Sequence, residues 1–193
     1  MYKLCKTEQS AKRQRQLEQG LLEMMAATQY EQISVSDLCD YMQVPRKSFY
    51  RYFASKDGAL HALIDHTLME YESINLVYKE GAKRTVHLEL TQFFQFWIEK
   101  KPLLDALQKS RMSGILVERS MAHATSMHGI PARFLPDDST EVRHQVIVFC
   151  VSGLMSMVFS WHREGYPRSA EQMATIVTRL LSQPLFANID HLL

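Results

Sequence analysis

The chain is poor in the residues that build a disulfide framework or a long disordered segment. Its 193 residues include three cysteines, seven glycines and six prolines. Because Cys5, Cys39 and Cys150 are scattered and odd in number, they imply no disulfide framework, and a reducing cytoplasm is the expected location. Hydrophobic residues make up 46% of the chain and charged residues 22%, so a sizeable core can form and global disorder is excluded.

The chain also lacks an apolar run that is long enough to span a membrane and uninterrupted by polar residues. The longest run, VIVFCVSGLMSMVFSW from Val146 to Trp161, is shorter than the roughly 20 residues that cross a bilayer, and serines and a glycine interrupt it. The first residues, MYKLCKTEQSAKRQRQ, are polar and basic and have no apolar centre of a signal peptide. We therefore expect no membrane partner, and we expect the long apolar run to be a buried helix.

Sequence motifs of common catalytic and metal sites are absent. The chain has no GxSxG elbow, Walker loop, HExxH motif or paired-carboxylate arrangement. The histidines of the pairs His61/His66 and His123/His128 are five residues apart, which does not place both on one helix face. We therefore expect no enzyme, no metal site and no cofactor.

Apolar residues recur at helical spacing, and strand signals are weak, so the predicted fold is all-α. A first helix is expected at about 8–28. Ser34, with Asp37, is expected to cap a second helix, Pro45 to stand in the first turn of a third, and Ser55 to cap a fourth. Further helices follow to the end of the chain. Since no linker rich in Gly, Pro or Ser intervenes, the fourth helix is expected to join two packed units, residues 1–54 and residues 55–193.

Positive charge is concentrated in one short segment. The net charge is only +1, yet between Met42 and Lys56 there are four bases and no acid. If Phe49 and Phe53 point inward, the third helix presents its bases and Tyr50 outward. A face of this kind can simply be solvated, but missing acids and neighbouring tyrosines favour contact with a polyanion. In a helix-turn-helix such a face lies in the major groove of DNA.

The stretch ISVSDLCDYMQVPRKSFYRYFASKDGAL resembles the N-terminal signature of TetR/AcrR-type transcriptional regulators, and the match covers about residues 10–64. The positions in register with that signature are Val35, Asp37, Leu38, Val44, Ser48, Phe49, Tyr50, Tyr52, Phe53, Ser55, Lys56 and Leu60. The resemblance implies a three-helix helix-turn-helix head that binds DNA. It also implies a helical body for effector binding and dimerisation, about nine helices in all, and a homodimer on a pseudo-palindromic operator.

Carried over position by position, the resemblance implies roles for individual side chains. The positions of base-edge contacts are taken by Arg46, Lys47 and Ser48, and those of phosphate contacts by Tyr50, Tyr52 and Lys56. Two further residues complete the DNA-binding set: Ser34, which caps the bracing helix and is a candidate for a backbone contact, and Arg51, which is open to either role.

The chain departs from the signature at the turn before the third helix. Gln29 and Gln43 stand where the family usually has Gly, and Pro45 where it usually has Ser. A left-handed backbone at Gln43 would cost on the order of 1 kcal/mol relative to Gly.

The body offers candidates for two further sites. An apolar effector pocket could be lined by side chains that are otherwise ordinary core: Phe93, Phe94, Trp97, Met112, Met121 and Phe149. A dimer interface is expected on the last two helices, against the alternative that these residues are buried within one chain: Val146, Phe149, Gly153, Ser156, Met157 and Ile176.

The function expected from these features is that of a sequence-specific DNA-binding regulator, a repressor that a small, largely apolar effector releases from its operator. The alternative is a TetR-like adaptor or activator that acts through a protein partner without a small-molecule effector.

Overall fold

The computed structural model describes residues 2–3, 5, 7–77, 85–125 and 139–183 of the 193-residue chain. This described part contains nine α-helices and one short 3-10 helix, and its only bridge between extended residues pairs Tyr2 with Phe53. The all-α prediction is therefore confirmed. The helices are α1 Glu8–Ala27, η1 Tyr30–Gln32, α2 Val35–Tyr41, α3 Arg46–Tyr52, α4 Lys56–Val77, α5 Val86–Glu99, α6 Lys101–Lys109, α7 Ser113–His123, α8 Thr140–Arg163 and α9 Ala170–Ser182.

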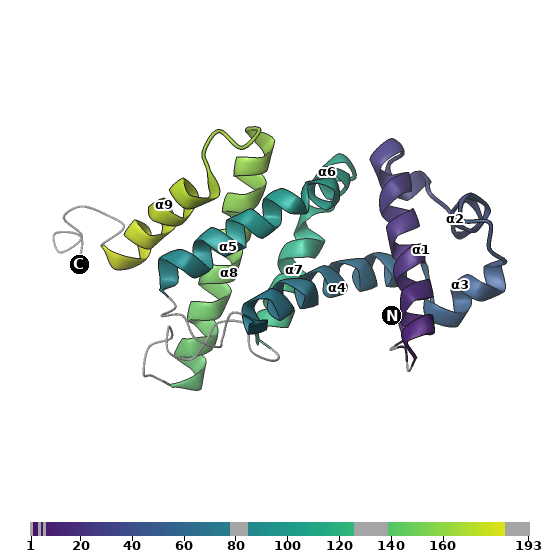
Figure 1. Ribbon diagram of the computed structural model, residues 1–193, viewed down its shortest axis with the longest axis horizontal. Coiled ribbons are helices and arrows are strands. Elements are labelled where there is room, and N and C mark those ends of the chain that lie inside the picture. The colour runs from purple at the N-terminus through teal and green to yellow at the C-terminus, as the bar shows by residue number, and fades with distance from the viewer. Residues whose placement is uncertain (1, 4, 6, 78–84, 126–138, 184–193) are drawn as a thin grey trace.

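The helices form a small head and a larger body (Figure 1). In the head, α1, α2 and α3 lie at one end of the molecule. In the body, α5 packs along α9, and α7 packs against α8. Helix α4 contacts both α1 and α7, and α6 also touches α1, so the head and the body meet along two helices.

Most helices begin at side chains that the sequence marks as caps. Ser34 and Asp37 form a capping box at the start of α2, and Ser169 and Gln172 form another at the start of α9. The Ser55 hydroxyl accepts the Gly58 N–H at the start of α4. By their spacing in the sequence, Asp138 and Glu141 are a further candidate capping box, for the long eighth helix. Asp138 lies outside the described residues, and the N-cap of α8 is Ser139.

Helix α2 ends in a Schellman motif with a non-glycine residue at its left-handed position. Gln43 has φ 52°. Its N–H donates to the Asp40 carbonyl, and the Val44 N–H reaches back to the Cys39 carbonyl. The left-handed backbone expected at Gln43 is present. Gln29, the other departure from Gly, has φ −63° and carries no such strain. Pro45 is the N-cap of α3 and so stands just before its first turn.

Aromatic and aliphatic side chains fill both parts. In the head, Leu17, Leu21 and Phe49 are almost completely buried. Gly20 allows Met42 to approach α1, because a Cβ there would lie 2.2 Å from the Met42 sulfur. In the body, the indole of Trp97 is almost completely buried.

The long apolar helix α8 is buried on one side only, which corrects the expectation of a buried helix. Its buried residues are Met155, Val158, Phe159, Trp161 and His162, whereas Phe149 is 66% exposed. By length and composition α8 could cross a bilayer, and 17% of its most apolar window is buried within the chain. One face of α8 is therefore uncovered in the single chain.

The strain at Gln43 generates a stability prediction. Replacing Gln43 with Gly removes a left-handed penalty of about 1–2 kcal/mol. The greater freedom of Gly in the unfolded state opposes this gain and costs about 0.4–1 kcal/mol of stability. We expect Gln43→Gly to raise the free energy of unfolding by about 0.5–1 kcal/mol in urea titrations followed by circular dichroism. Gln29→Gly is the matched control and should lower it by about 0.4–1 kcal/mol. A loss of stability in both variants would contradict the assigned turn.

Candidate nucleic-acid interface

Helix α3 separates its apolar and basic side chains onto opposite faces. Phe49 and Phe53 are completely buried, with ring centroids 5.1 Å apart. Arg46, Lys47 and Arg51 are exposed. Phe49 points inward from α3, and Phe53, the extended C-cap residue directly after the helix, packs against it, so the two buried rings together fix the orientation of α3. The structure therefore places the predicted bases of α3 on its solvent side.

Tyr50 shares the outward face with these bases. Its side chain is 44% exposed. Its hydroxyl hydrogen-bonds the Arg46 guanidinium one turn earlier, and this interaction raises the pKa of Arg46. The Arg46 side chain thus lies along the helix, beside the Tyr50 hydroxyl. Ser48 is half-buried and accompanies them at the edge of the face.

Lys56 points into the protein at the start of α4. Its Nζ donates to the Tyr30 and Ile33 carbonyls, at 2.6 Å each, and lies 4.1 Å from the centroid of the Tyr30 ring. The Tyr30 hydroxyl in turn donates to Asp57 at 2.6 Å. These contacts tie η1 to the first turn of α4. In this arrangement the Lys56 ammonium satisfies protein carbonyls, so its implied phosphate contact stays a prediction.

The other two predicted backbone contacts differ in exposure. The Tyr52 side chain is 6% exposed and packs beside Phe53. Ser34 is exposed, but its hydroxyl accepts the Asp37 N–H at 3.1 Å as part of the capping box. The Ser34 N–H bonds to the Asp37 carboxylate, and the two bonds lower the pKa of Asp37.

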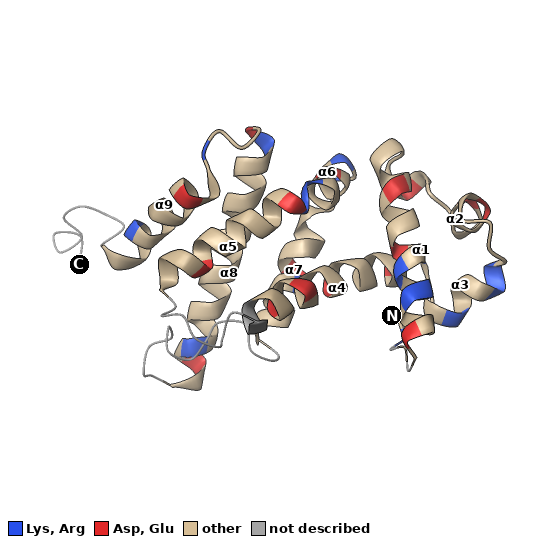
Figure 2. Ribbon diagram, in the orientation of Figure 1, with Lys and Arg blue, Asp and Glu red and all other residues tan. Residues whose placement is uncertain are grey.

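The basic surface extends onto α1, which the sequence pattern of the third helix does not reveal. Lys12, Arg13 and Arg15 are exposed. Figure 2 shows Lys and Arg on the N-terminal half of α1 and at both ends of α3. Lys3 links the two helices, since its carbonyl accepts from Gln14 of α1 and its N–H donates to the last carbonyl of α3. In the sequence these bases appear as the run KRQR at 12–15. The run indicates an extended basic surface only when the positions of α1 and α3 are known.

The effector candidates are spread over α5, α7, α8 and the turn between α6 and α7. On α5, Phe93 packs edge-on against both Phe94 and Trp97. Met121 accepts a contact from the Ser152 hydroxyl between α7 and α8. Phe149 is exposed on the outside of the body, and Met112 lies partly buried at the turn between α6 and α7.

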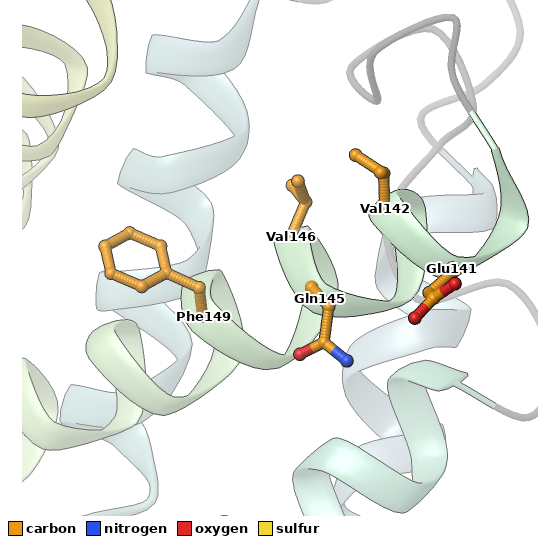
Figure 3. A pocket seen from close by; sticks show the side chains of 5 residues that line it. All are labelled: Glu141, Val142, Gln145, Val146 and Phe149. Carbon is orange, nitrogen blue, oxygen red and sulfur yellow. The ribbon is translucent and has the colours of Figure 1, made fainter.

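Two hollows formed by described residues are both open to solvent. The first has a volume of about 430 Å³ and is lined from α8 alone by Glu141, Val142, Gln145, Val146 and Phe149 (Figure 3). The second, about 580 Å³, lies between α6, α7 and α8 and is lined by Gln108, Ser113, Gly114, Val117, Ser156, Phe159 and Arg163. Neither encloses a ligand. Among the described residues, no group of three or more His, Cys, Asp or Glu side chains could hold a metal ion.

The dimer candidates lie on the uncovered side of α8 and α9. Phe149, Gly153, Ser156 and Ile176 are exposed, and Val146 and Met157 are half-buried. Exposed apolar neighbours extend this surface: Val142, Leu180 and Leu181.

Lys47 and Lys56 should respond differently to substitution. Lys56→Met leaves two backbone carbonyls without a charged donor, so we expect the free energy of unfolding to fall by about 2–4 kcal/mol. Lys47→Met, on the exposed face of α3, should change it by less than about 0.5 kcal/mol. Urea unfolding of both variants checks this difference. Equal stabilities would show that the Lys56 contacts contribute little.

Comparisons with known proteins extend the resemblance from the sequence to the fold. No protein-family model and no curated protein matches the chain. Solved structures do match. A TetR-family transcriptional regulator from Syntrophomonas wolfei superimposes with a TM-score of 0.58 at 16% identity, over 92% of this chain and 99% of that one.

Two other regulators are similar over most of their length. The dihydroxyacetone kinase operon activator DhaS gives a TM-score of 0.57 at 14% identity, over 88% of this chain and 94% of that one. The fatty acid degradation regulator FadR from Bacillus halodurans gives 0.52 at 16% identity, over 89% and 95%. The resemblance in the N-terminal signature is thus matched by the architecture, and the chain has the fold of TetR-type transcriptional regulators.

Proposed function

We propose that this protein is a sequence-specific DNA-binding transcriptional regulator that acts as a homodimer. The observation that carries the proposal is the outward face of α3, where Arg46, Lys47, Tyr50 and Arg51 are exposed on a helix without an acid. Guanidinium and ammonium groups can donate to the guanine acceptors of the major groove and to phosphates. The fold supports this reading, because its matches include proteins described as transcriptional regulators.

The proposed contacts divide into two kinds. Arg46 and Lys47, at the start of α3, are placed to read base edges, as the N-terminal residues of a recognition helix do. Tyr50, Arg51 and the bases of α1 are placed to contact phosphates. Phosphate contacts supply affinity and salt dependence, whereas base contacts supply sequence preference.

A second copy of the chain is the proposed cover for the outer faces of α8 and α9. Phe149 is 66% exposed and Leu181 55%, and full burial of a side chain of this size contributes about 1.5–3 kcal/mol. Gly153 leaves open space in which a facing helix can approach. A two-fold pair would bury this surface once on each copy and present two recognition helices to two half-sites.

The response mechanism has two candidates. In the first, a small, largely apolar effector binds in the body near the α5 aromatic side chains and favours a state with lower DNA affinity, which makes the protein a repressor. In the second, a protein partner replaces the effector, and the regulator acts as an adaptor or activator. The edge-on contact of Phe94 with Trp161, with ring centroids 5.4 Å apart, fills the space between α5 and α8 and favours the second. A co-purified small molecule in native mass spectra would favour the first.

DNA binding is tested by fluorescence anisotropy with duplexes from the region upstream of the gene. We expect specific binding to a pseudo-palindrome. Arg51→Gln should weaken binding to all sequences and reduce the salt slope by about 1, whereas Lys47→Gln should relax preference at one base position at a cost of about 1–3 kcal/mol. Lys101→Gln, an exposed charge on α6, is the matched control and should change neither. Absence of binding to every upstream duplex at low salt would refute the proposal.

The oligomeric state is tested by analytical ultracentrifugation. The wild-type chain should sediment as a dimer at micromolar concentration, and Phe149→Glu should sediment as a monomer because it places a charge in the apolar contact. Leu88→Glu replaces an equally apolar residue, 40% exposed on α5, and should leave the dimer intact. A wild-type monomer that instead floats with lipid vesicles would assign the apolar face of α8 to a bilayer.

A further inference from the structure

The N-terminal segment is fastened to the end of the proposed recognition helix. Tyr2 forms an antiparallel bridge with Phe53, and the Lys3 N–H donates to the Tyr52 carbonyl at 2.9 Å. Tyr52 is the last residue of α3, where carbonyls have no partner within the helix. The segment therefore provides one of the bonds that fix this end of α3.

The same segment is also fastened to α1. The Gln14 side chain is 2% exposed and donates its amide N–H to the Lys3 carbonyl at 3.2 Å. The Cys5 thiol donates to Oε1 of the Gln14 side chain at 2.9 Å. The segment is therefore bonded to the end of α3 on one side and to α1 on the other.

Tyr2 reaches from this segment to α4. Its hydroxyl donates to Asp65 Oδ2 at 2.8 Å. Asp65 is 8% exposed, and Arg119 of α7 binds both oxygens of the same carboxylate through Nε and Nη2. Burial and the Asp65 contact raise the pKa of Tyr2 to about 12, so the hydroxyl remains a donor at neutral pH.

A second buried pair stands beside this contact. Glu18 of α1 is 1% exposed, and both its oxygens lie within 3.0 Å of His66 Nδ1 on α4. The Tyr2 ring meets His66 edge-on with centroids 5.6 Å apart. Asp65 is thus paired with Arg119, and Glu18 with His66. Tyr2 contacts both pairs, through its hydroxyl and through its ring.

We propose that Tyr2, Asp65 and Arg119 are positioning residues that couple the body to the recognition helix. The path runs from α7 through Arg119 to Asp65, then through Tyr2 to the backbone bonds at the end of α3. A ligand or partner that favours a different position of α7 would change the support of α3, which is how two states of the body can differ in DNA affinity. This inference rests on the proposed function of α3.

Amide hydrogen exchange of the free protein tests the coupling without DNA. Tyr2→Phe removes the hydroxyl and keeps the ring, and it should speed exchange at Lys3 and Phe53 about tenfold, the effect of one hydrogen bond to a charged group. Arg119→Gln, on a different helix, should speed exchange at the same amides several-fold. The double variant should exchange about as fast as Tyr2→Phe alone, because the two residues act in series.

Two further variants separate coupling from general destabilisation. Glu70→Gln breaks the ion pair between Glu70 of α4 and Lys100, which joins α4 to the body away from the proposed path. It should leave the exchange of Phe53 unchanged. Arg119→Lys keeps the charge but not the two-point contact, so it serves if Arg119→Gln fails to fold, and it should give an intermediate rate.

The outcomes distinguish this inference from the proposed function. Unchanged exchange at Phe53 in Arg119→Gln and Arg119→Lys, or fully additive effects in the double variant, would overturn the coupling even if the protein binds DNA. If the exchange pattern is as expected but no duplex binds, the mechanical path stands and the proposed function fails. If both hold, Tyr2→Phe should weaken operator binding while the salt slope stays unchanged, because no phosphate contact is lost.

Discussion

The insertion of two phenylalanines into the head, Phe49 of α3 and Phe53 directly after it, is the constraint on which the proposed DNA surface depends. Phe49 and Phe53 are four residues apart and have no exposed surface. Helix α3 has only seven residues and would not be stable alone, so its position comes from this packing. Once both rings are inside, the bases at the start and end of α3 have only the solvent side available.

Helix α4 carries several of the polar contacts that join this head to the rest of the molecule, and Lys109 of α6 adds others by donating to the Ala26 and Ala27 carbonyls of α1. Along a single helix, Lys56 holds η1, His66 holds Glu18 of α1, and Asp65 holds both Tyr2 and Arg119. Buried charges of this kind add little net stability compared with apolar packing, but removing one partner is costly. Their main consequence here is geometric, since they fix which residues of the head and the body lie opposite each other.

Much of the fold could be predicted from the sequence because its signals are local. Ser34 and Asp37 are three residues apart, and so are Ser169 and Gln172, so both caps are visible in the sequence and both are present. The turn at Gln43 could be located from the resemblance, because Gln43 stands where the family usually has Gly. At the start of α8 the spacing of Asp138 and Glu141 indicates a cap at Asp138, whereas the N-cap in the structure is the next residue, Ser139.

The candidate site was only partly predictable. The bases of α3 are exposed as expected, but the bases of α1 join them only because the chain folds α1 beside α3. The apolar composition of α8 indicated burial, yet composition does not say on how many sides a helix is covered, and Phe149 stands outside.

The sequence by itself determined where several helices begin and which face of α3 is basic, because capping and amphipathic spacing act within about four residues. The tertiary structure decided which cations remain exposed and which groups connect the body to the head. Lys56 finds its two carbonyls 23 and 26 residues away, and Asp65 lies 63 residues from Tyr2 and 54 from Arg119. Contacts over such separations depend on how whole helices pack, and no local pattern in the chain encodes them.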